Sequence, residues 1–174
     1  MNGLRRLAYW LWKVLPIPRW GQWIILWLGN TKFLVGVVGV VFDDQDRVLL
    51  LKHTYRNRYP WGLPSGWVGK HEQLDAALAR ELAEETGLDI SVGDVLLVES
   101  GERWPQLDVY YLCRYRGGEF RPNAEISAMR FCALDELPAQ MLATQRKKLA
   151  LALDRHRRSD GNRQDARETP GTPG

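Results

Sequence analysis

The sequence predicts an α+β domain in which a mixed β-sheet lies between helices, preceded by a tryptophan-rich helical segment. Apolar runs rich in β-branched residues and bounded by turn residues recur along the chain, as strands do. Residues 73–86 have a helical pattern without proline, which Gly87 ends, and a second helical pattern follows the last strand-like run. Apolar residues make up 45% of the 174 positions, which is enough for one packed core.

Composition divides the chain into three parts: a helical segment at residues 1–30, a domain at residues 31–158 and a tail at residues 159–174. The tail is rich in Gly, Pro and charged residues, so it is predicted to be disordered. The net charge is +3, and residues 1–42 contain five basic and no acidic residues, so the remainder carries 3 − 5 = −2. The basic charge therefore does not describe the domain, and no nucleic-acid partner is expected.

The N-terminal segment has two competing interpretations. Pro16 and Pro18 would break it into two short helices, and its longest apolar run, residues 20–31, is too short to span a bilayer. It could pack as a helical hairpin on the domain or on a second subunit of a homodimer. Tryptophans with basic and no acidic residues are also typical of a helix that lies in a membrane surface, which would give peripheral membrane contact through residues 4–28. We expect a cytoplasmic protein, membrane-associated in the second case.

The strands follow in order along the domain. Residues 33–42 and 47–53 predict a hairpin around the turn at 43–46, and residues 61–66 form a tight loop. The later predicted elements are strands at 94–100, 106–116 and 125–133, then a helix from Leu134 to about Arg155.

The two cysteines, Cys113 and Cys132, lie in strand-like segments and are interpreted as buried thiols. Their spacing is not that of a metal site, and nothing in the sequence supports a disulfide. His71 is interpreted as a loop residue.

Three carboxylates share one side of the helix at 73–86. On a helix that turns about 100° per residue, Glu81, Glu84 and Glu85 fall within an arc of about 100°. The leucines of the helix lie on the same side, so the carboxylates should face the protein body or a cleft in it. Carboxylates that converge there would repel one another and take up protons unless a cation compensates them. Oxygen ligands favour a hard ion, so the sequence predicts Mg²⁺ or Mn²⁺.

Residues 66–88, GWVGKHEQLDAALARELAEETGL, resemble the Nudix box, G-x5-E-x7-R-E-U-x-E-E-x-G-U with U aliphatic. Every defined position matches. Ser65 stands where many members of the family have Gly, a mild departure outside the box. The resemblance implies the Nudix α/β/α sandwich over about residues 33–155. It also implies metal-dependent hydrolysis of a phosphoanhydride bond in a nucleoside diphosphate linked to another group.

The resemblance also implies roles for individual residues. Glu81, Glu84 and Glu85 would hold the divalent ions, together with the backbone carbonyl of Gly66. Arg80 would pair with Glu72 and so orient the carboxylates.

Many Nudix enzymes add one acidic residue from a later loop, as a further ligand or as the base. Glu125 is the candidate here, with Glu119 and Glu102 as alternatives. The predicted catalytic residues are thus Arg80, Glu84, Glu85 and Glu125.

The substrate is less well defined by the sequence. Nucleoside triphosphates, ADP-ribose and nucleotide sugars all remain open. One Nudix subgroup that acts on ADP-ribose has a proline about 15 residues beyond the box, and Pro105 gives only weak support because it lies 17 residues beyond Leu88. Two alternatives have different functions: a membrane-associated enzyme on a nucleotide-linked lipid or envelope precursor, and a nucleotide-binding domain without catalysis. The residues that could stack on a base are Trp61, Trp67 and Trp104, and those that could reach phosphates are Arg56, Arg58 and Arg103.

Overall fold

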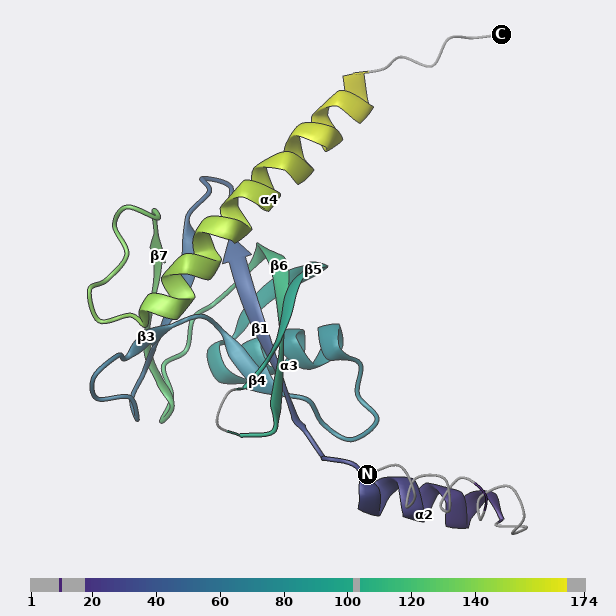
Figure 1. Cartoon of the computed structure of the whole chain (residues 1–174). Helices are drawn as coiled ribbons and strands as arrows, with labels where there is room; N and C mark the ends of the chain where they lie inside the picture. Colours follow the sequence, from purple (N-terminus) through teal and green to yellow (C-terminus); the bar gives the residue numbers. More distant parts are fainter. Residues whose placement is uncertain (1–9, 11–17, 102–103, 169–174) are drawn as a thin grey trace, which may run out of the picture. The chain divides into compact units, whose positions relative to one another are not determined.

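The computed structural model describes residue 10, residues 18–101 and residues 104–168, with side chains as far as Arg157. The chain forms two compact units, Met1–Lys32 and Phe33–Gly174 (Figure 1). In the first unit, helix α2 spans Arg19–Gly29 and buries none of its residues. The first of the two predicted N-terminal helices lies outside the described residues except for Trp10. No helix in the described ranges is long and apolar enough to cross a membrane.

The second unit is built on a seven-stranded mixed sheet. Strands β3, β2, β1, β6 and β5 are neighbours in that order, while β4 pairs with β1 and β7 pairs with β2. The β1–β6 pair is parallel and the other pairs of named strands are antiparallel. The bounds are β1 Leu34–Phe42, β2 Val48–His53, β3 Trp61–Gly62, β4 Ser65–Trp67, α3 Leu74–Thr86, β5 Leu88–Ser100, β6 Gln106–Gly118, β7 Ile126–Cys132 and α4 Ala143–Glu168.

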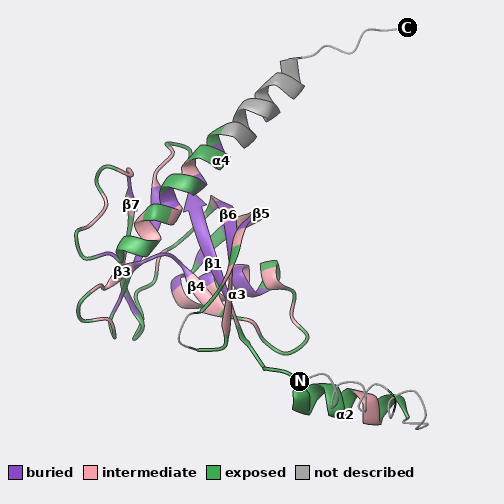
Figure 2. Ribbon diagram, viewed as in Figure 1, coloured by how far each residue is buried: buried purple, intermediate pink, exposed green. Residues whose placement is uncertain are grey.

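The central strands are covered on both faces. Alternate residues of β1 point to opposite sides: Val37 and Val41 pack in the core beneath α3, while Val38 and Val40 pack with α4. Strand β2 divides in the same way, so both strands read as continuous apolar runs and are buried along most of their length (Figure 2). The predicted mixed sheet between helices, the Nudix-type α/β/α arrangement, is therefore confirmed. It positions α3 against β1 and β4, where the motif residues lie.

Strand β5 is longer than predicted. It begins at Leu88, immediately after the helix, rather than at residue 94. Gly93 and Asp94 look like a turn in the sequence, but the pairing with β6 continues across them with a shift of register between Val92 and Val95. A β-bulge takes up the extra residues without ending the strand. The predicted loop at 61–66 likewise contains two very short strands, β3 and β4.

The last helix begins and ends later than predicted. Residues 134–142 are turns and a short bridge, because Pro138 cannot donate the backbone hydrogen bond of a helix interior. Helix α4 starts at Ala143 and continues to Glu168, beyond Arg155 and beyond the predicted start of the tail at Ser159. Once nucleated, a helix propagates through Arg, Gln, Ala and Glu, and residues 143–169 contain no proline. The remaining tail, residues 169–174, lies outside the described residues.

Candidate active site

Helix α3 is anchored at its end by Gly87 and along one side by apolar residues. Gly87 has φ 75° and its N–H donates to the Ala83 carbonyl at 2.9 Å, which ends the helix in a left-handed cap. Leu78 and Leu82 are buried against the sheet. These contacts fix the rotation of the helix about its axis and thereby decide where its carboxylates point.

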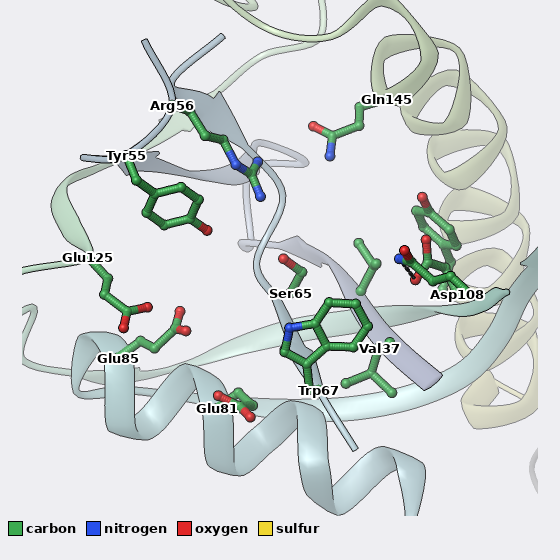
Figure 3. Close-up of a pocket in the computed structure, with 15 residues that line it drawn as sticks. Val37, Tyr55, Arg56, Ser65, Trp67, Glu81, Glu85, Asp108, Glu125 and Gln145 are labelled. Atoms are coloured by element: carbon green, nitrogen blue, oxygen red, sulfur yellow. Dashed lines mark hydrogen bonds between the residues drawn. The ribbon is translucent and has the colours of Figure 1, made fainter. Parts of the chain in front are cut away.

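Two carboxylates of α3, those of Glu81 and Glu85, line part of a pocket of about 470 Å³. Glu81 and Glu85 rise from the helix, and Glu125 reaches the same side from the loop before β7 (Figure 3). Glu84 does not line the pocket; its side chain is 64% exposed and pairs with Arg80. Of the three carboxylates that the sequence places on one side of the helix, two therefore line the pocket and one is exposed outside it.

Gly66 brings strand β4 unusually close to the helix. A Cβ atom at this position would lie 2.1 Å from Cγ and 2.6 Å from Cβ of Glu81, distances at which atoms overlap. Only glycine fits at position 66. The reason is the lack of space for a side chain, because the backbone there does not have a positive φ. The backbone of residue 66 consequently borders the pocket beside Glu81.

Arg80 connects the loop and the helix through a network of hydrogen bonds. Its Nε donates to Glu72 Oε1 at 2.7 Å, and its Nη atoms donate to Glu81 and Glu84 at 3.1 Å. Glu72 also accepts from the Gly69 N–H at 2.8 Å. The hydrogen bond from Arg80, together with that from Gly69, lowers the pKa of Glu72 to about 2. The predicted Arg80–Glu72 ion pair is present, and it fastens the preceding loop to the middle of α3.

Glu85 is the most perturbed carboxyl of the pocket. Burial, followed by the negative charges of Glu81 and Glu125, raises the pKa of Glu85 to about 7, while Arg56 acts in the opposite direction. A carboxyl of this kind is half protonated near neutrality, which marks a site of uncompensated negative charge. Figure 3 shows the side chains of Glu85 and Glu125 directed toward one another.

Asn123, which the sequence analysis did not identify, holds Glu125 in place. Its Oδ1 accepts the backbone N–H groups of Glu125 and Ile126 at 2.8 and 2.7 Å, and its Nδ2 donates to the Glu85 carbonyl at 2.9 Å. The side chain therefore ties the loop to the C-terminal end of α3. An Asn that bonds backbone groups two and three residues ahead is a common turn device, which is the only signal the sequence offered.

The alternatives to Glu125 are placed elsewhere. Glu119 is largely exposed and pairs with Arg121 at 3.3 Å, and it does not line the pocket. Glu102 lies outside the described residues. His71 is an exposed loop residue with φ 62°.

The donor set suits a hard divalent cation, although it is not preformed. Among the described residues no group of three or more His, Cys, Asp or Glu side chains is gathered closely enough to hold a metal ion. Two of the predicted ligands are instead engaged by Arg80, whose two Nη atoms donate to Glu81 and Glu84. The raised pKa of Glu85 nevertheless reports carboxylates that a cation would stabilise. Carboxylate oxygens with the nearby backbone of Gly66 fit Mg²⁺ or Mn²⁺ in ligand type.

Three tryptophans could stack on a base according to the sequence, and one of them lines the pocket. Trp67 lines the pocket, whereas Trp61 packs against the core on the α4 side of the sheet and Trp104 is exposed outside the pocket. A Cβ atom built at Gly36 would lie 2.4 Å from Asp108 Oδ1 and 3.7 Å from a Trp67 ring carbon, so both side chains approach the backbone at Gly36.

Arg56 is the basic candidate that lines the pocket. Arg58 is exposed over the Tyr59 ring, and Arg103 lies outside the described residues.

Known proteins similar to this chain carry Nudix and MutT names. The chain is 35% identical over 98 residues to the 8-oxo-dGDP phosphatase NUDT18 of Danio rerio, a match that covers 55% of this chain and 29% of that protein. It is 28% identical over 120 residues to the MutT-like protein of Streptomyces ambofaciens, covering 69% and 77%. The chain thus spans less than a third of the zebrafish relative.

Solved structures show the same fold. An ADP-ribose pyrophosphatase from Streptococcus suis superposes with a TM-score of 0.62 at 30% identity, over 72% of this chain and 93% of that one. A NUDIX hydrolase from Nitrosomonas europaea gives a TM-score of 0.65 at 22% identity, over 74% of each chain. The model of the NUDIX domain family matches residues 32–153, which contain the pocket, the glutamates and the Arg80 network. This chain belongs to the Nudix family.

Proposed function

We propose that this protein hydrolyses a phosphoanhydride bond in a nucleoside diphosphate linked to another group, with Mg²⁺ or Mn²⁺ as its cofactor. The observation that carries the proposal is that Glu81, Glu85 and Glu125 line one pocket of about 470 Å³, a volume in the usual range of small-molecule sites. Support also comes from similar proteins, whose names are those of an ADP-ribose pyrophosphatase and an 8-oxo-dGDP phosphatase. When bound, the cation would polarise a phosphoryl oxygen and offset the negative charge of substrate and carboxylates.

The charged residues of the motif and Glu125 each have a role in this proposal. Glu81, Glu84 and Glu85 would supply oxygens to the cation, together with the backbone carbonyl of Gly66, and Glu84 would have to give up its ion pair with Arg80. Arg80 and Glu72 keep the loop and helix in register, as groups that orient metal ligands commonly do. Glu125, whose side chain points toward Glu85 (Figure 3), would accept a proton from an attacking water. Attack by water on one phosphorus would give a nucleoside monophosphate and the remaining phosphorylated group.

A panel of candidate substrates tests the proposal. The purified protein is incubated with Mg²⁺ or Mn²⁺ and nucleoside triphosphates, oxidised triphosphates, ADP-ribose or nucleotide sugars, and the products are separated by chromatography. We expect metal-dependent cleavage of one class, reduced by orders of magnitude in a Glu84→Gln/Glu85→Gln variant that keeps its fold. Full activity in that variant would refute the assignment. No cleavage of any compound by the wild type would favour a binding role without catalysis.

The exposed tryptophans of helix α2 support a second proposal: the enzyme works at a membrane surface on a nucleotide-linked lipid. Its tryptophans are exposed, Trp23 by 72% and Trp27 by 65%, and Lys32 lies over the Trp27 ring at 4.4 Å. Apolar and aromatic side chains beside basic residues suit an anionic lipid surface. The full chain should float with anionic vesicles, and Trp23→Glu/Trp27→Glu should not. Failure of both to float, with a dimer mass by light scattering, would favour the homodimer instead.

A further inference from the structure

A network of three polar side chains joins helix α4 to the strands beside the pocket. Lys148 Nζ, from α4, donates to Glu99 Oε1 on β5 and to the Tyr110 hydroxyl on β6, the latter at 2.7 Å. The Tyr110 hydroxyl in turn donates to Glu99 Oε1 at 3.1 Å. Each of the three side chains therefore contacts the other two, and together they connect one helix with two strands.

The ammonium group of this network is enclosed and charged. The side chain of Lys148 is 17% exposed, whereas that of Glu99 is 41% exposed. Burial acts to lower the pKa of Lys148, but the hydrogen bonds to Glu99 and Tyr110 outweigh burial, so the pKa lies above its ordinary value. An enclosed cation is costly unless it is paired and hydrogen-bonded, and both of these partners meet that need. The contacts therefore hold the Lys148 side chain in one place.

The network forms part of the wall of the pocket. Tyr110 is 4% exposed and lines the pocket, and its hydroxyl is engaged by Lys148 and Glu99. Gln145 also lines the pocket (Figure 3). It precedes Lys148 by three residues on α4, so the two side chains are neighbours on the helix surface. The point at which Lys148 is held thus determines where Gln145 borders the pocket.

Apolar packing alone leaves the position of α4 loosely defined. In the described part of the helix the buried apolar residues are Leu149 and Ala152. Burial of apolar surface is not directional, so two such residues hold the helix on the sheet without fixing its position along its axis. Another polar contact joins α4 to β5, from Arg155 Nη1 to the Leu96 carbonyl at 2.6 Å. It lies about 10 Å further along the helix than Lys148, away from the pocket.

We propose that Lys148 is a positioning residue for substrate binding. Through Glu99 and Tyr110 it holds the first turns of α4 against the sheet and so fixes the part of the pocket wall that Gln145 contributes. Lys148 itself does not touch the substrate. Its loss therefore weakens the binding of substrate and transition state alike, which raises KM and leaves kcat unchanged. The change in KM rests on the proposed function, whereas the attachment of the helix does not.

Amide hydrogen exchange tests the attachment without turnover. Exchange in residues 145–149 should be about tenfold faster in full-length Lys148→Met than in the wild type, and close to wild type in Lys148→Arg, which keeps a cation with donors. Arg155→Met is the matched control, because it removes the same charge and the other polar contact between α4 and β5. It should not accelerate exchange in this segment. Unchanged exchange in Lys148→Met, or equal acceleration in Arg155→Met, would overturn the proposal.

Kinetics test the role in binding, on whichever substrate the wild type cleaves. Lys148→Met should raise KM by about tenfold with kcat changed by less than about twofold, and Lys148→Arg should recover most of the loss. Glu99→Gln keeps an acceptor but removes the charge, so it should raise KM by about threefold. If Lys148→Met does not fold, the same split between KM and kcat is measured in Glu99→Gln. A residue that only stabilises the fold would instead lower the melting temperature and leave KM unchanged.

A double variant separates position from charge. Because Lys148 and Glu99 have opposite charges, Lys148→Met/Glu99→Gln has the same local net charge as the wild type. KM should stay raised in this variant, since the contacts remain lost. A KM restored to the wild-type value, an unchanged KM in Lys148→Met, or an equal rise in Arg155→Met would each overturn the proposal. A wild type that cleaves no compound of the panel would contradict the proposed function, and hydrogen exchange would then decide on the attachment of α4.

Discussion

Replacing Gly66 with alanine should separate catalysis from folding. The new Cβ would lie 2.1 Å from Glu81 Cγ, whereas ordinary contacts of such atoms begin at 3.4 Å, so the groups must move apart by 3.4 − 2.1 = 1.3 Å. The obstruction is near the base of the Glu81 side chain, with its Cβ at 2.6 Å, so rotation of the carboxylate alone cannot remove it. Strand β4 and helix α3 must therefore shift.

The expected loss is larger for turnover than for stability. A displacement of about 1 Å in a catalytic group can cost about a hundredfold in rate. Overpacking of this kind costs about 1–3 kcal/mol in the free energy of unfolding. We therefore expect Gly66→Ala to retain a cooperative unfolding transition while kcat falls by about a hundredfold on whichever substrate the wild type cleaves.

Gly39→Ala is the matched control. It adds the same methyl group beside the same helix, but its nearest neighbours are Leu78 side-chain atoms at 3.4 Å, an ordinary contact. Both variants are compared by initial rates and by urea unfolding. Gly66→Ala with the turnover of Gly39→Ala would refute the reasoning, because it would show that the position of Glu81 against β4 does not matter for catalysis.

Three further predictions follow from the charges and thiols. In metal-free protein the pKa of Glu85 is raised from 4.5 to about 7, so the folded state binds more protons between these values and loses stability as pH rises through them. Thermal unfolding at pH 5 and pH 8 should show Glu85→Gln gaining about 1 kcal/mol over wild type at the higher pH, after screening by solvent; an equal difference at both pH values would contradict this. Arg80→Gln should lower turnover by about tenfold or more with the circular dichroism spectrum unchanged, since it frees carboxylates that Arg80 now orients. Cys113 and Cys132 are free and buried, and burial raises the pKa of Cys113 to about 12, so a thiol reagent should label neither until the protein is unfolded.

Much of the fold could be predicted because its signals are local. The run at residues 33–42, the hairpin after it and the helix before Gly87 depend on apolar pattern and on one glycine, and the structure places β1, β2 and α3 within one residue of the expected bounds. Strand β5 could not be predicted in full, because only its pairing with β6 shows that Gly93 lies in a bulge rather than a turn. The start of α4 was missed because the effect of Pro138 outweighs the helical character of its neighbours.

The candidate site shows the same division between local and distant information. Helical spacing correctly predicts that Glu81 and Glu85 share a side. It also predicts Glu84 on that side, but the Glu84 side chain forms an ion pair with Arg80 at 3.1 Å and does not line the pocket. The approach of Gln145 to Gly62 could not be foreseen, since these residues are far apart in sequence and come close only when α4 covers the sheet. Asn123 was missed for a similar reason: its contact with the Glu85 carbonyl spans 38 residues.

Cleavage in ¹⁸O-labelled water, with and without Mg²⁺, tests the central claim most directly. The preferred substrate is identified first, and mass spectrometry then locates the label in the products of wild type and of Glu84→Gln/Glu85→Gln. The account predicts one ¹⁸O in a single phosphorylated product, formed with the metal and nearly lost with a chelator or in the variant. Undiminished cleavage in the presence of the chelator, or products without label, would contradict a metal-dependent attack by water at the glutamate side of the pocket.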